Sequence, residues 1–157
     1  MRLRKMVAEC KVLASDTKWR EDDLPPRHSV IYEKTRPMRG GWKWRSVTAK
    51  SNKGEYVLLA QCNPRKDEWK AWLIYKTEEG SPSVVSRLEF HGSHPGLHVH
   101  AHCARGGVEE GSSSIDGLPR IPSAHQPHRR VHVWQEDTFW NYSLEHFRIR
   151  DAQGDLL

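Results

Sequence analysis

Cysteine is scarce in this 157-residue chain, which has only three. Cys10, Cys62 and Cys103 are an odd number and form no Cys-x-x-Cys pair, which excludes a disulfide framework and a four-cysteine zinc site. Long apolar runs are also missing, and no apolar stretch with a cleavage site follows the basic N-terminus. We therefore expect a reduced cytoplasmic protein that does not interact with a membrane.

Apolar residues are few as well, at 36% of the chain, while charged residues reach 29%. Seven Trp and three Phe nevertheless supply large side chains for a core. The length fits one domain and is too short for two full ones. We therefore expect residues 1–157 to form a single domain.

Charge is distributed unevenly along the chain. The first 76 residues hold 18 Lys and Arg against 9 Asp and Glu, whereas residues 77–157 hold 7 against 11. Nine of the ten histidines lie at or after His91. A basic surface attracts polyanions, nucleic acid first among them, but it also simply keeps a protein soluble. The charge pattern alone leaves both interpretations open.

Short apolar segments with turn residues between them fill the middle of the chain, and short loops predict that consecutive strands pair antiparallel. We predict an α+β fold, with a single antiparallel β-meander sheet of five to six strands and helices at the N- and C-termini. The five clearest strands are Trp42–Lys50, Tyr56–Cys62, Trp69–Lys76, Val84–Phe90 and Leu97–Cys103.

The remaining segments give weaker signals. Residues 3–14 fit both helical and strand periodicity, with a slight preference for helix, and residues 29–33 suggest one short strand. Asp137 or Thr138 is a candidate N-cap for the C-terminal helix. Glycine, serine and proline in residues 104–130 predict a long flexible loop or lid.

The strongest local signal is a strand in which apolar residues alternate with histidine. Side chains alternate between the two faces of a strand, so His98, His100 and His102 share one face. Core packing gives no reason for three histidines in this pattern. We therefore interpret this strand as part of a candidate site.

The preceding strand adds a carboxylate and a guanidinium to the same face. In a hairpin that pairs Glu89 with His98, Arg87 lies opposite His100, and the apolar residues of both strands lie on the other face. A carboxylate or neutral histidine can accept the proton of a ribose 2′-hydroxyl, and a protonated histidine can donate to the leaving oxygen. Arginine can bind the phosphate.

These residues predict histidine-dependent cleavage of a phosphodiester in RNA or a nucleotide, without a cofactor. Glu89 and one of the histidines at positions 98 and 100 are the expected base and acid. The complete set of candidate catalytic residues is Glu89, His98, His100 and His102. The candidate substrate-binding residues are Arg87, His94, Arg130 and His132.

Two other function classes stay open. A strand His-x-His pair can place two imidazoles on one zinc ion, with His98, His100 and His132 as the alternative ligands of a metal-dependent hydrolase. The chain could also be a non-catalytic module that binds nucleic acid or protein through its basic half, such as an antitoxin or immunity-type protein.

Four tryptophans in the predicted sheet admit two roles. Trp42, Trp44, Trp69 and Trp72 could form a stacking platform for bases, although aromatic residues more often fill sheet cores. We expect the core role for these four residues. An exposed tryptophan on a basic face would favour nucleic-acid binding.

The run from His98 to Ala104 resembles the histidine-triad signature, His-φ-His-φ-His-φ-φ, where φ is apolar. This resemblance implies a nucleotide hydrolase or transferase in which His100 attacks phosphorus and His98 and His102 support it. The order of Arg87 and Glu89, a histidine-bearing hairpin and a C-terminal helix is also similar to small uncharacterised prokaryotic proteins of toxin–antitoxin loci. That similarity implies an RNA-cleaving toxin or a defence-associated factor.

Overall fold

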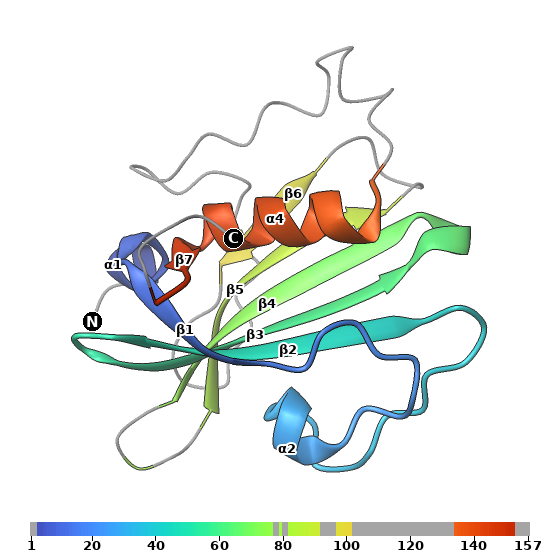
Figure 1. The fold of residues 1–157 in the computed structure, drawn as a ribbon, viewed down its shortest axis with the longest axis horizontal. Helices are drawn as coiled ribbons and strands as arrows, with labels where there is room; N and C mark the ends of the chain where they lie inside the picture. The colour runs from blue at the N-terminus through green and yellow to red at the C-terminus, as the bar shows by residue number, and fades with distance from the viewer. Residues whose placement is uncertain (1–2, 77–78, 80–81, 92–96, 102–133, 153–157) are drawn as a thin grey trace.

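A twisted seven-stranded sheet forms the centre of the protein, with helices on both sides (Figure 1). The computed structural model describes residues 3–76, 79, 82–91, 97–101 and 134–152, with the backbone alone at 3–4 and 98–101. The predicted loop at 104–130 lies outside these residues. The strands are β1 Lys11–Asp16, β2 Lys43–Ser51, β3 Gly54–Asn63, β4 Glu68–Lys76, β5 Pro82–His91, β6 His98–Ala101 and β7 Ile149–Arg150. The helices are α1 Leu3–Ala8, α2 Pro26–Ser29, the 3-10 turn η1 Pro64–Lys66 and α4 Glu136–His146.

The α+β architecture and the central meander are as predicted, but the sheet is not a single antiparallel meander. Its order is β6-β5-β4-β3-β2-β1-β7, and neighbours from β1 to β6 are antiparallel. β7 pairs with β1 in parallel, through Lys11 with Ile149 and Val12 with Arg150. A two-residue strand carries no periodicity, and for that reason the sequence could not predict it.

Three local predictions near the ends of elements are also corrected. Residues 3–14 hold both a helix, which ends at Ala8, and the strand β1. Residues 29–33 form no strand, because Pro25–Pro26 starts the short helix α2, in which Pro26 occupies a favoured first position. The N-cap of α4 is Gln135, and Thr138 accepts a hydrogen bond from its backbone N–H at 2.9 Å.

The sheet separates two clusters of buried side chains. β3 is apolar on both faces because it lies in the middle of the sheet, with Leu58 on the side of α1 and α4 and Leu59 on the side of α2. The segment 20–38, which includes α2, covers only one end of the second face through Leu24 and Val30. The polar end of that same face holds the candidate site.

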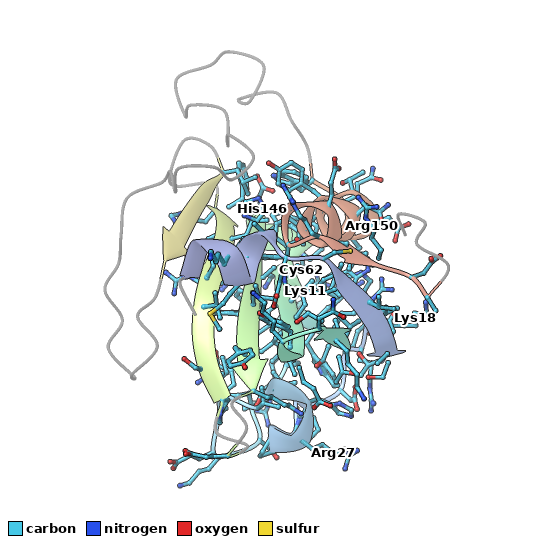
Figure 2. The ribbon with its side chains drawn as sticks, turned by 90° about the vertical axis from the view of Figure 1, so that its left-hand side faces the viewer. Lys11, Lys18, Arg27, Cys62, His146 and Arg150 are labelled. Carbon is cyan, nitrogen blue, oxygen red and sulfur yellow. The ribbon has the colours of Figure 1, made fainter. Side chains whose placement is uncertain are left out.

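Lys11 joins the ends of α1 and α4 to the sheet. Its side chain is fully buried, and Nζ donates to the carbonyl oxygens of Val7 at 3.2 Å, Glu9 at 2.9 Å and Phe147 at 2.9 Å (Figure 2). Burial lowers the pKa of Lys11 to about 7. The amine thus satisfies carbonyls at two helix ends that have no partner within their own helices.

We expect His146 to make folding stability fall in mild acid. Its ring is 4% exposed and neither nitrogen has a hydrogen-bond partner among the described residues. Burial, together with the nearby charge of Lys11, lowers the pKa of His146 from 6.5 to about 4. The folded state therefore binds fewer protons than the unfolded state between these values, so the stability present above pH 6.5 decreases as the pH falls toward 4.

The expected loss is about 3 kcal/mol in the free energy of unfolding, since each pKa unit corresponds to about 1.4 kcal/mol. Urea unfolding at pH 7.0 and 4.5 measures this loss. In His146→Phe, which keeps an aromatic ring in the same site, the loss between the two pH values should be about 3 kcal/mol smaller than in the wild type. An unchanged loss would mean that other groups, such as the paired carboxylates, cause the acid sensitivity.

Candidate functional site on the α2 side of the sheet

The sequence left the register of the β5–β6 hairpin open by two residues, and the structure has the register considered first. Glu89 is paired with His98, and Arg87 is paired with His100. Between them, Leu88 is fully buried in the cluster that packs against α4. Cross-strand partners lie on the same face of a sheet, and therefore positions 98 and 100 belong to the face of Arg87 and Glu89.

The carboxylate of Glu89 lies among three nitrogen-bearing side chains. Its Oε2 is 2.9 Å from Nε of Arg87, and its Oε1 is 3.8 Å from Nζ of Lys70 and 3.7 Å from Nε2 of His91. The Glu89 side chain is 10% exposed. A buried carboxylate is tolerated when it is paired in this way, since the cations replace the water that burial removes.

Lys70 is the residue of this cluster that sequence reasoning missed. It lies on β4 and is paired with Glu89 across the β4–β5 ladder. This ladder changes register between Leu73 and Ile74, so counting residues across the turn does not give the correct partner. The alternation along β4, with Lys70 between the core residues Trp69 and Ala71, was the signal that it lies on this face.

Among the described residues, the cations of this cluster outnumber its carboxylate. Arg87 and Lys70 carry two positive charges against the single carboxylate of Glu89, while Glu68 lies one row away, paired with His91. The side chains of Arg87 and Lys70 are 22% and 30% exposed, so water reaches both. A partly exposed site with surplus positive charge can attract and hold an anion such as a phosphodiester.

The structure therefore brings part of the predicted site together. The side chains of Arg87 and Glu89 are in contact, and the backbone positions of His98 and His100 lie opposite them. The other predicted site residues lie outside the part of the chain that the structure describes. They are His94, His102, Arg130 and His132.

Metal ligation was the alternative use of these histidines. Within the described segments, no group of three or more His, Cys, Asp and Glu side chains is placed to hold a metal ion. The alternative ligand set of His98, His100 and His132 extends beyond the described side chains and stays a prediction.

The four tryptophans of the sheet divide into core residues and one half-buried residue. Trp44, Trp69 and Trp72 are buried, which confirms their expected role in the core. Trp42, just before β2, is half-buried, and its ring centroid lies 6.0 Å from Nζ of Lys70. One aromatic ring thus lies next to the candidate site.

A cavity of about 320 Å³ lies elsewhere, near the N-terminus of α4. Trp69 and Trp134 belong to its lining and to the core cluster on the α4 side of the sheet. The cluster of Arg87, Lys70 and Glu89 lies on the opposite face, so this cavity is not part of the candidate site.

The chain matches no protein-family model, no curated protein and no solved structure at a significant level. The histidine-triad resemblance of residues 98–104 consequently depends on that motif alone. The described segments contain no helix that is both long and apolar enough to cross a membrane. The geometry around Glu89 is accordingly the main basis for assigning a function.

Proposed function

We propose that the face formed by β4, β5 and β6 cleaves phosphodiester bonds in RNA or a nucleotide without a metal ion. One observation carries the proposal: the buried carboxylate of Glu89, held by Arg87 and Lys70, is paired with the position of His98 on the adjacent strand, and Arg87 is paired with the position of His100. Acid–base groups and phosphate-binding cations are the parts that this reaction requires.

Glu89 accepts the proton of the 2′-hydroxyl as general base in this mechanism. The 2′-oxygen attacks the adjacent phosphorus, and the bond from phosphorus to the 5′-oxygen breaks. His98 or His100, in its protonated form, donates a proton to that leaving oxygen. The products are a 2′,3′-cyclic phosphate and a free 5′-hydroxyl, with no proton gained or lost overall.

Arg87 and Lys70 have two functions in this scheme. Both lie within 4 Å of the Glu89 carboxylate and hold it in place through ion pairs. They also stabilise the negative charge that increases on the phosphoryl oxygens in the transition state. The guanidinium has further N–H donors besides the Nε that faces Glu89, which suits it to phosphate.

We expect chelation to leave the cleavage rate unchanged. A fluorescently labelled single-stranded RNA is incubated with protein that has been dialysed against EDTA, and the fragments are resolved by electrophoresis. Cleavage at an equal rate with and without EDTA supports the mechanism above. Loss of cleavage in EDTA, restored by zinc, would favour the zinc-dependent hydrolase, and binding without any cleavage would favour a non-catalytic nucleic-acid-binding module.

A further inference from the structure

We propose that Trp42 forms a nucleotide-binding subsite with Lys70 and Arg65, so that the substrate is a single-stranded RNA rather than a mononucleotide. The inference rests on the proposed function and specifies its substrate class. The ring of Trp42 stacks with the base of a nucleotide next to the cleaved bond, and the two cations contact the phosphates on either side.

Trp42 differs from the other sheet tryptophans because the segment 20–38 does not bury it. That segment covers Trp44, whose indole Nε1 donates to the carbonyl oxygen of Asp22 at 2.7 Å and whose ring lies 5.4 Å from that of His28. Trp44 is fully buried as a result, whereas Trp42 stays half-buried. A partly exposed indole can stack with a base at little cost in desolvation.

Glycines immediately before Trp42 bring Arg65 close to it. Gly40 and Gly41 have φ values of +69° and +94°, which turn the chain from the covering segment into β2. A Cβ atom on Gly41 would lie 3.2 Å from Cδ of Arg65. The Arg65 side chain thus packs against the backbone next to Trp42, while Lys70 lies near the indole ring itself.

The surface around this ring is basic. Besides Lys70, three exposed cations lie on the segments that meet there, since Arg39 precedes the two glycines and η1 carries the other two. Asp67 and Glu68 are the acidic residues of the same turn. With Glu89, which is paired with Lys70, these described residues hold four cations against three carboxylates, which leaves a surplus of one positive charge for a polyanion. The four cations are Arg39, Arg65, Lys66 and Lys70.

Lys70 connects this subsite to the proposed reaction centre. Its Nζ lies 3.8 Å from Oε1 of Glu89 and 6.0 Å from the ring centroid of Trp42. A base on Trp42 and a phosphate at Arg87 would therefore both lie next to the same ammonium group. A strand with at least two adjoining nucleotides fits this arrangement, and a mononucleotide leaves one half of it empty.

The test measures binding separately from cleavage. Glu89→Gln protein, in which the proposed base is absent, is titrated into a labelled eight-nucleotide single-stranded RNA, and the Kd is read from fluorescence anisotropy. Adding Trp42→Ala is expected to raise the Kd about tenfold, within the range for loss of one stacked base, and Trp42→Phe should restore most of the affinity. Trp19→Phe, on the α4 side of the sheet, is the control and should not change the Kd.

An equal Kd with and without Trp42, or no binding of the RNA, would overturn this inference. Thermal unfolding of each variant ensures that a changed Kd does not reflect loss of the fold. If the wild-type protein cleaves no RNA but Trp42→Ala weakens binding, the proposed function fails while the subsite stands. If the wild type cleaves RNA and Trp42→Ala binds and cleaves it normally, the subsite fails while the proposed function stands.

Discussion

Replacing Glu89 by glutamine is expected to lower kcat for RNA cleavage by 100-fold or more. Glutamine has nearly the same size and shape as glutamate but cannot accept the proton of the 2′-hydroxyl, and general acid–base groups typically contribute about 10²- to 10⁴-fold. Single-turnover cleavage of a labelled RNA measures the rate. Of His98→Ala and His100→Ala, we expect at least one to cause a loss of similar size, because one of these positions supplies the acid.

Glu68→Gln is the matched control for this experiment. Glu68 lies on the neighbouring row of the same face, paired with His91, and its replacement changes the charge by the same amount. Its kcat should stay within a fewfold of wild type. If Glu89→Gln and Glu68→Gln lower the rate equally, Glu89 affects cleavage only through the electrostatic effect of its negative charge.

A structural role of Glu89 predicts a different pattern of results. Glutamine leaves Arg87 and Lys70 without their carboxylate, so some loss of stability is expected beside the loss of rate. Glu89→Asp keeps the charge but moves the carboxylate back by one methylene. Under the proposal it keeps most of the stability and loses much of the rate, and a normal rate in both Glu89→Asp and Glu89→Gln would exclude a base at this position.

The second large effect concerns stability, and it arises from the ion pair between β1 and β2. Removing Arg45 is expected to lower the free energy of unfolding by about 2 kcal/mol, because Asp16 loses both hydrogen bonds from the guanidinium and keeps only its contacts with Lys18. Arg45 Nη2 lies 2.6 Å and Nε 3.0 Å from the two oxygens of Asp16, and both side chains are 11% exposed. The guanidinium also lies 4.2 Å from the ring centroid of Trp140, which connects the pair to α4.

A double-mutant cycle separates the ion pair from the packing of the arginine. Urea unfolding of Arg45→Met, Asp16→Asn and the double variant gives the coupling energy, which should be at least about 1 kcal/mol.

Burial acts to raise the pKa of Asp16, but hydrogen bonds from Arg45 and Lys18 outweigh it and lower that pKa. The pair therefore stabilises the fold at neutral pH and loses this effect as acid protonates Asp16. Additive single effects at pH 7 would show that the pair contributes nothing.

The sequence predicted the candidate face better than it predicted the edges of the sheet. Alternation in two consecutive strands sets the face of every residue, so the pattern placed Glu89 and His98 on one face. It left the register open by two residues, and the structure shows that these two residues are paired. The two-residue strand β7 and the helix α2 were missed for a different reason. Both are held by contacts with the rest of the chain, and segments of this length have no periodicity of their own.

Some side-chain contacts could not be predicted from the sequence either. The bulge in the β4–β5 ladder concealed Lys70 as the neighbour of Glu89. Likewise, no pattern distinguishes the half-buried Trp42 from the buried Trp44, since the difference arises from where the segment 20–38 ends. The alternation along each strand predicted which face of the sheet a residue lies on. Only the structure shows which residues of neighbouring strands are in contact on that face.

The most direct measurement uses an oligodeoxynucleotide that contains a single ribonucleotide, incubated with the wild-type protein in EDTA. Cleavage only on the 3′ side of that ribonucleotide, leaving a 2′,3′-cyclic phosphate, is the result that attack by the 2′-oxygen requires. An oligonucleotide that stays intact while an all-RNA strand is bound, or one that is cut equally at its deoxynucleotides, would contradict the account.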